Sequence, residues 1–323
     1  MSKRQRLCAL TLVLMVTFSV PAYGWGNVGH MAVAFVAYQK LTPAARNRVD
    51  TLVRLNPKFN AWQAMIPAGT SAARRRMMLF MIAATWADQI KGDGEHTADG
   101  THNGNRPPTD GTADRNTGYT DTAMHKYWHF VDRPFSRDGT PLQDPPVPNA
   151  ETQIDALRQV LASTETAALK SYDLVWLMHL VGDVHQPLHA TARFTSTQPE
   201  GDDGGNGVKL CSLPCKNNLH SFWDGLPGSA NDVKASIAPA IAYGQSLAAA
   251  PAASVNKLNT SVWITESFDA AKSSVYKTPI GAGTGPFTIT TTYRNAARTL
   301  ARQRVALAGA RLARILNNEL TLP

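Results

Sequence analysis

The stretch "LMHLVGDVHQPLHA", residues 177–190, combines the apolar side chains of a buried helix with three histidines and one aspartate. His179 and Asp183 are four residues apart. In a helix they would project from the same face, one turn apart, where two side chains can bind one metal ion. His189 follows Pro187, which should interrupt the helix and let His189 approach from another direction. The stretch therefore predicts a metal site within an apolar part of the fold.

Two further pairs have the same spacing. "LHSFWD" places His220 four residues before Asp224, and "MHKYWHFVD" places His125 four residues before His129. A single pair of this kind more often reflects a hydrogen-bonded core histidine or a surface pair, but a second pair with the same chemistry favours metal binding. Spacing alone leaves open whether His125 or His129 takes part.

Asp88 in "ATWADQIK" and His30, five residues after Trp25, extend the set of possible ligands. A helix-terminal aspartate bonded to backbone would explain Asp88 equally well. If Trp25 begins the mature chain, its α-amino group and carbonyl oxygen could chelate an ion together with His30. Imidazole and carboxylate ligands suit zinc. The H-E-x-x-H and G-x-S-x-G patterns are absent, which argues against a zincin protease and an α/β serine hydrolase.

The first residues predict export. Lys3, Arg4 and Arg6 precede an apolar run over 7–20 and the small-residue pattern at 22–24. These features are typical of a secretory signal peptide covering residues 1–24, with cleavage before Trp25. We therefore expect a secreted or periplasmic protein.

The remaining cysteines fit an oxidising compartment. Cys8 would leave with the signal peptide, so Cys211 and Cys215 in "CSLPC" are predicted to form a disulfide. A zinc site is the other use of two close cysteines, but the histidines and aspartates pair better with one another. The formal charge of +8 falls to +5 without Lys3, Arg4 and Arg6, which favours anionic partners. No later stretch is apolar for long enough to span a bilayer, so no stable membrane association is expected.

Hydrophobic periodicity predicts a mainly α protein, a single domain over residues 25–323 with long loops and a small β-hairpin. Helices are expected within 25–56, over 71–91, 150–169, 172–185, 230–250 and 254–275, and from 293 to 320, with a short strand at 287–292. Polar loops are expected at 92–121, 133–149 and 195–218. The arginines of the last helix fit a solvated basic face better than a nucleic-acid contact surface.

Six fragments, in this order, resemble the S-one/P-one nuclease family: "WGNVGH", "WADQIK", "HFVD", "HLVGDVHQPLH", "DDGGN" and "LHSFWD". Members are secreted, mainly α-helical enzymes with three zinc ions that cleave single-stranded nucleic acids and 3′-nucleotides. The resemblance implies a fold shared with these nucleases and with zinc-dependent phospholipase C. It covers the chain from Trp25 to about Asp224.

The resemblance also implies a ligand set for three Zn²⁺ ions. Trp25, His30 and Asp183 would hold one ion; Asp88, His129 and His179 would hold its neighbour, with Asp183 bridging; His189, His220 and Asp224 would hold the third. It selects His129 over His125, because the family ligand precedes an aromatic residue and then an acid two positions further on. His185 matches no ligand.

Further roles follow from the same resemblance. Phe130 would stack on a base, Asp132 would bond to its edge, and Asn206 would line the substrate cleft. Lys91 stands where some members carry a basic residue that reaches the phosphate, and Asp88 would orient the attacking water or receive its proton. The expected activity is hydrolysis of single-stranded DNA and RNA to 5′-phosphate products, with 3′-nucleotidase activity, by a monomer.

Two other functions compete with this interpretation. A zinc-dependent phospholipase C has a similar metal set but tends to end it with Glu, where this chain has Asp224, and spaces its first Trp and His more widely. A non-catalytic, basic zinc-containing nucleic-acid-binding protein would not need Asp88 beside a zinc pair. The loop at 92–121 matches no family role, and family members often have more cysteines.

Overall fold

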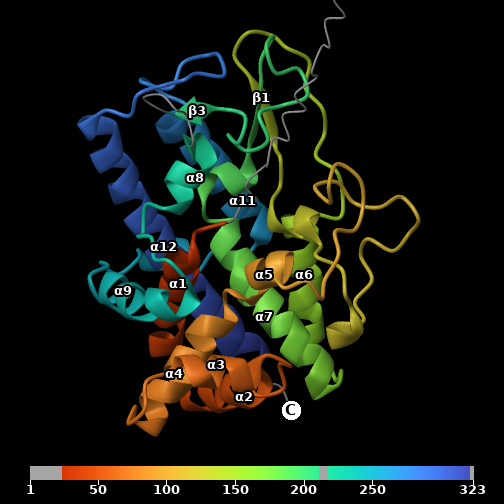
Figure 1. Ribbon diagram of the computed structural model, residues 1–323, viewed down its shortest axis with the longest axis vertical. Coiled ribbons are helices and arrows are strands. Elements are labelled where there is room, and N and C mark those ends of the chain that lie inside the picture. The colour runs from red at the N-terminus through yellow and green to blue at the C-terminus, as the bar shows by residue number, and fades with distance from the viewer. Residues whose placement is uncertain (1–23, 211–216, 321–323) are drawn as a thin grey trace, which may run out of the picture.

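Helix α7 (Ala167–Asp183), which carries His179 and Asp183, runs through the middle of the molecule (Figure 1). It begins at Thr166, whose hydroxyl accepts a hydrogen bond from the backbone N–H of Leu169. Every residue from Lys170 to Asp183 is buried. A helix that is apolar on all sides must be surrounded by other elements, and α7 contacts α1, α2, α6 and α12 among others.

The computed structural model describes residues 24–210 and 217–320. The helices are α1 (Asn27–Lys40), α2 (Pro43–Val53), α3 (Phe59–Met65), α4 (Ala72–Ala83), α5 (Trp86–Gln89), α6 (Ala150–Leu161), α7, α8 (Leu219–Asp224), α9 (Val233–Gln245), α10 (Ala252–Val255), α11 (Thr260–Ala270) and α12 (Thr291–Glu319). Short 3₁₀ helices cover Ile90–Gly92, Gly118–Thr120, Lys126–His129 and Pro187–Ala190, and a π-helical turn covers Ala271–Val275. The mainly α fold is confirmed.

Two small strand pairs lie at one end of the helical body, opposite α2, α3 and α4 (Figure 1). β1 (Pro134–Ser136) pairs in parallel with β2 (Ala192–Phe194). β3 (Lys209–Leu210) pairs antiparallel with β4 (Asn217–Asn218), within the segment 195–218 that the sequence predicted to be a polar loop. The β1–β2 pair aligns the segment after His129 with the segment after His189. It thus brings two candidate ligands together from distant parts of the chain.

Several predicted boundaries are wrong. The helix expected over 71–91 is two helices, because the chain turns at Ala84 and Thr85 before α5 begins. The strand expected at 287–292 is absent from the described chain: Phe287 forms only an isolated bridge with Leu210, and Thr290 caps α12. The helix expected over 254–275 is interrupted between α10 and α11.

Some predictions fall outside the described residues. These are the signal peptide up to residue 23 and the cysteine pair, Cys211 and Cys215. Within the described ranges, 24–210 and 217–320, no helix has the length and apolar character needed to cross a membrane.

Candidate active site

The C-terminal end of α7 holds the centre of a buried group of imidazoles and carboxylates. Asp183 is fully buried, and its Oδ2 lies 3.3 Å from His179 Nε2 and 2.9 Å from His129 Nδ1. Its other oxygen, Oδ1, lies 3.3 Å from His30 Nε2 and 3.8 Å from His189 Nδ1. Asp183 therefore faces four histidines from four different elements.

Asp88 approaches the same group from α5. Its Oδ1 lies 3.5 Å from His179 Nε2, and its Oδ2 lies 4.0 Å from His30 Nε2. The rings of His30 and His179 stack with their centroids 3.8 Å apart. His30, Asp88 and His179, and likewise His129, His179 and Asp183, have ligand atoms close enough to share one metal ion.

A second donor group consists of His189, His220 and Asp224. His220 Nε2 lies 3.5 Å from Asp224 Oδ2 and 3.0 Å from His189 Nε2. The Nδ1 atoms of both histidines lie 2.7 Å from backbone carbonyl oxygens, those of Gly204 for His220 and His129 for His189. Since a carbonyl oxygen only accepts, both Nδ1 atoms carry the proton in the neutral rings. The two Nε2 atoms therefore face each other with bare lone pairs, an arrangement that a shared cation would stabilise.

His179 is oriented in the same way. Its Nδ1 donates to the carbonyl oxygen of Ala84 over 2.8 Å, which leaves Nε2 facing Asp88 and Asp183. Hydrogen bonds of this type fix the tautomer and the ring orientation of metal-binding histidines. The turn between α4 and α5, which the sequence did not predict, supplies this carbonyl group.

Buried donor atoms without hydrogen-bond partners give further support for metal binding. Both ring nitrogens of His30, Nε2 of His129 and Oδ1 of Asp183 are buried without a hydrogen-bond partner. Buried polar atoms are nearly always satisfied. Their concentration at one point, with imidazole and carboxylate as the donors, matches the chemistry of a zinc site.

Electrostatics keeps Asp88 ionised and His129 and His220 neutral, whereas Asp183 and Asp88 raise the pKa of His179 to about 10 against the effect of burial. Burial alone would raise the pKa of Asp88, but the Lys91 ammonium and His179 hold it well below its ordinary value. Burial, with the Lys91 ammonium, lowers the pKa of His129 to about 3, and burial beside His189 lowers the pKa of His220 to about 3. Neutral imidazole and ionised carboxylate are the forms that bind metal.

Asp224 is the exception among the carboxylates. Burial raises its pKa well above the ordinary value, and Asp183 and Asp88 add to this against the hydrogen bond from Gln186. A cation at the second donor group would offset this repulsion. Gln186, whose Nε2 donates to Asp224 Oδ1 over 2.8 Å, was missed by sequence reasoning. Its signal was a polar residue inside the apolar run of 177–190.

Two glycines allow the close approach of ligand rings. A β-carbon at Gly182 would lie 2.8 Å from His30 Nδ1. Gly204 has a φ of +56°, and a β-carbon there would lie 2.7 Å from the carbonyl oxygen of Leu188 and 3.2 Å from His220 Nδ1. Neither position accepts a side chain without displacing its neighbours.

The N-terminal segment lies against the same group. Trp25 is fully buried, and the Gly26 N–H donates to the Asp224 carbonyl oxygen over 3.1 Å. A side chain at Gly24 would collide with the Asp183 carboxylate and crowd His30. The peptide that precedes Trp25 therefore occupies space directly beside Asp183.

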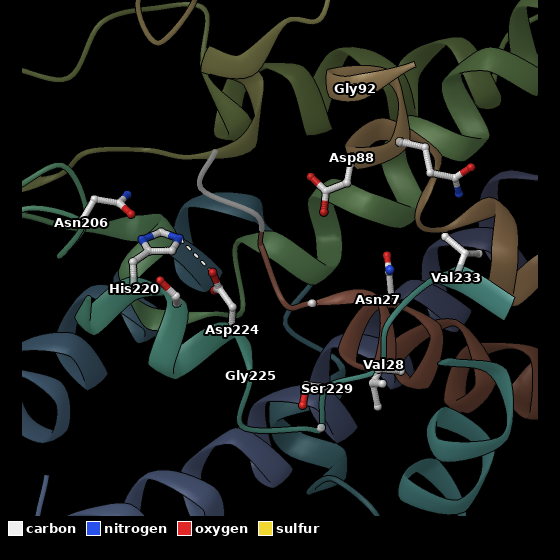
Figure 2. A pocket seen from close by; sticks show the side chains of 15 residues that line it. Asn27, Val28, Asp88, Gly92, Asn206, His220, Asp224, Gly225, Ser229 and Val233 are labelled. Atoms are coloured by element: carbon white, nitrogen blue, oxygen red, sulfur yellow. Dashed lines mark ion pairs between the residues drawn. The ribbon is translucent and has the colours of Figure 1, made fainter. Parts of the chain in front are cut away.

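Both donor groups open into one cleft of about 460 Å³. Figure 2 shows His220, Asp224 and Asn206 on one side of it and Asp88 on the other. The Lys91 side chain is only 3% exposed, and its Nζ lies 2.8 Å from Asp88 Oδ1. Asn206 is held at the rim by hydrogen bonds to Asp203 and Asn218.

Phe130 and Asp132 are both half-buried on the segment after His129. Asp132 lines a separate cavity of about 340 Å³ with Arg106, from the long loop at 92–121, and Asp203. Burial, Asp203 and Asp202 raise the pKa of Asp132 well above its ordinary value. Phe130 lines neither this cavity nor the cleft.

His125 and His185 lie in other environments. His125 bonds to two carboxylates, with Nδ1 2.9 Å from Asp99 Oδ2 and Nε2 2.8 Å from Asp121 Oδ2. It therefore ties the loop at 92–121 to the helical body. His185 is fully buried, and its two ring nitrogens contact Val181 O and Arg311. Neither residue belongs to a donor group of the described chain.

Comparison with known proteins identifies the family to which the chain belongs. The profile of the family described as S1/P1 Nuclease matches residues 25–321. The chain belongs to the S1/P1 nuclease family. Nuclease S1 of Aspergillus oryzae is 24% identical over 211 residues, which cover 62% of this chain and 54% of that protein. Endonuclease 2 of Arabidopsis thaliana is 23% identical over 216 residues, 67% of this chain and 60% of that protein.

Another relative matches over a shorter segment with higher sequence identity. Endonuclease 1 of Arabidopsis thaliana is 45% identical over 51 residues, 16% of this chain and 14% of that protein. The chain thus aligns with less than two thirds of each of these relatives. Members of the S1/P1 nuclease family are in general zinc-dependent, and the donor groups around Asp183 and His220 fit that metal.

Proposed function

We propose that this protein is a zinc-dependent nuclease that hydrolyses single-stranded DNA and RNA to 5′-phosphate products and also dephosphorylates 3′-nucleotides. Family membership supports the reaction class. The observation that carries the proposal is the pair of His189 and His220 Nε2 atoms, 3.0 Å apart with both Nδ1 protons donated to carbonyl groups. This pair opens into the same cleft as Asp88.

We propose three zinc ions, held as the resemblance implies. Trp25, His30 and Asp183 would hold one ion, Asp88, His129 and His179 together with Asp183 would hold a second, and His189, His220 and Asp224 would hold the third. Bound zinc ions supply Lewis acidity toward an attacking water and toward phosphoryl oxygens.

The protein side chains orient the reactants. Asp88, whose pKa is held well below its ordinary value, is ionised at neutral pH and is a poor proton acceptor. It orients the attacking water through a hydrogen bond. The Lys91 ammonium, paired with Asp88, offsets the negative charge of the phosphodiester.

The base-binding roles explain a preference for single strands. Phe130 stacks on an exposed base, and Asp132 forms hydrogen bonds with its edge. A paired base cannot offer its face to Phe130. Asn206 binds the substrate at the rim of the cleft, near His220.

The N-terminus supports an exported, processed protein that forms one nuclease domain from Trp25 onward. Cleavage after Gly24 would replace the Gly24–Trp25 peptide bond with a free α-amino group, next to Asp183 and His30. Export is also the basis for a disulfide between Cys211 and Cys215.

An N-terminal extension tests this arrangement. We expect protein that begins at Trp25 to bind zinc and release nucleotides from single-stranded DNA, and to lose activity with a chelator. The same protein with two residues added before Trp25 should bind about one zinc ion less and lose most of its activity. Equal zinc content and rate in the two proteins would contradict the N-terminal ligand.

A further inference from the structure

A second concave surface adjoins the cleft on the far side of α8. It is a groove of about 520 Å³ between α8, the segment at 287–289 and the first turns of α12. Ser221, Gly225 and Ser229 line both the groove and the cleft, so the two spaces are continuous. Helix α8 thus presents His220 and Asp224 to the cleft and Phe222 to the groove.

The groove is basic. Among residues 24–210 and 217–320, the charged lining residues are Arg294 and Arg298, one helical turn apart on α12, and no carboxylate of these ranges lines the groove. Both arginines are exposed, and within the described ranges neither forms an ion pair with an acid. By contrast, Arg304 and Arg311 on the same helix are buried and paired with Glu266. The charge of Arg294 and Arg298 is therefore available to an anionic ligand.

The groove also has fixed aromatic walls. The Arg294 guanidinium lies over the Phe222 ring, 5.3 Å from its centroid, which holds the arginine across the groove. Tyr293, next to it, is buried and accepts a hydrogen bond from Trp223 Nε1, so α12 is fastened to α8 at this point. Phe287 adds a half-buried aromatic face. Cationic groups alternating with aromatic faces are what single-stranded nucleic acid needs for phosphates and bases.

We propose that this groove is a strand-binding subsite, which holds nucleotides of a single-stranded substrate beyond the scissile phosphate. Arg294 and Arg298 contact phosphates, and Phe287 offers a face to a base. The subsite rests on the proposed nuclease function and adds to it a preference for polynucleotides over mononucleotides. We therefore expect a mononucleotide to bind in the cleft without using the groove.

Kinetics of the double variant Arg294→Ala/Arg298→Ala test the subsite. With a single-stranded DNA 12-mer, we expect KM to rise about 2- to 30-fold, the combined effect of two exposed charge contacts, with kcat unchanged. The slope of log(kcat/KM) against log(salt concentration) should become less negative by about 1.4, since each phosphate contact on a single strand contributes about 0.7 to this slope. KM for a 3′-mononucleotide should not change.

Two control variants distinguish phosphate binding in the groove from a general loss of positive charge and from an effect on the hydrolysis step. Arg314→Ala removes an exposed arginine elsewhere on α12 and should behave as wild type. Arg294→Lys/Arg298→Lys should keep most of the 12-mer affinity. An unchanged KM for the 12-mer in an active double variant would overturn the subsite. So would an equal rise with the mononucleotide or with Arg314→Ala.

Direct binding keeps the subsite testable if the nuclease proposal fails. In the presence of a chelator, fluorescence anisotropy with a labelled 12-mer should show weaker binding by the double variant than by wild type and Arg314→Ala. In a separate assay with zinc and without chelator, absence of hydrolysis by wild type would refute the proposed function alone. Equal binding of the 12-mer by the three proteins would refute the subsite. So would a double variant that binds the 12-mer as wild type does and loses binding only to anionic lipid vesicles.

Discussion

Replacing Gly182 by Ala should damage the metal centre without unfolding the protein. The new β-carbon would lie 2.8 Å from His30 Nδ1, whereas ordinary contacts begin at 3.4 Å, so the ring must move by about 0.6 Å. The His179 ring also restricts how the His30 ring can move, because the two rings stack with their centroids 3.8 Å apart. A zinc–nitrogen bond tolerates displacements of about 0.2 Å. The movement is therefore about three times what the bond accepts.

The stability of the metal-free chain should change much less. Alanine is favoured over glycine inside a helix by about 1 kcal/mol, and overpacking costs about 1–3 kcal/mol, so the two effects partly cancel. We expect zinc affinity at the His30 position to fall by about 10- to 100-fold, the range for disturbed support of a ligand. kcat/KM on single-stranded DNA should fall in parallel.

Zinc content after dialysis at fixed free zinc, measured by mass spectrometry, provides the assay. Gly283→Ala is the matched control, because a β-carbon there meets nothing within 4 Å. Circular dichroism should show that both variants are folded. A Gly182→Ala protein with wild-type zinc content and wild-type rate would refute the placement of His30 as a ligand.

Three other predictions concern the same region. Asp88→Asn should lower kcat on single-stranded DNA by at least about 100-fold while the protein stays folded, and full activity would remove the role given to Asp88. Gln186→Ala should weaken zinc binding by about 10- to 100-fold, because Asp224 loses its hydrogen bond; unchanged zinc titrations would contradict this. Asp121 and Asp99 raise the pKa of His125 above 6.5 against burial, so their stabilising effect is complete below about pH 6.5 and is lost as pH rises through the raised pKa. Asp99→Asn should therefore cost more stability in urea unfolding with a chelator at about pH 6 than at about pH 10, and an equal cost at both would contradict the ion pair.

The local spacing of residues was sufficient to predict parts of the candidate site. The i, i+4 spacing placed His179 with Asp183 and His220 with Asp224, and both pairs lie on helices. The polar residues of 177–190 are buried, as the apolar neighbours indicated. Which distant residues join them depends on tertiary packing, and spacing alone could not choose His129 over His125. Family resemblance made that choice.

Other features had no local signal. The turn at Thr85 contains neither Gly nor Pro, yet it aims Asp88 and supplies the carbonyl group for His179. "FTITTT" has high strand propensity, but Thr290 serves as a helix cap and the chain enters α12. The sequence indicated no role for the loop at 92–121, because its contacts to the helical body join Asp99 and Asp121 to His125. These contacts form only in the folded chain.

Product analysis on protein that begins at Trp25 tests the central claim most directly, with metal content measured on the same sample. Single-stranded DNA and RNA should yield nucleotides that carry 5′-phosphates, at about three zinc ions per chain, and a phosphatidylcholine should remain intact. Products with 3′-phosphates, release of phosphocholine, or tight nucleic-acid binding without hydrolysis would contradict it.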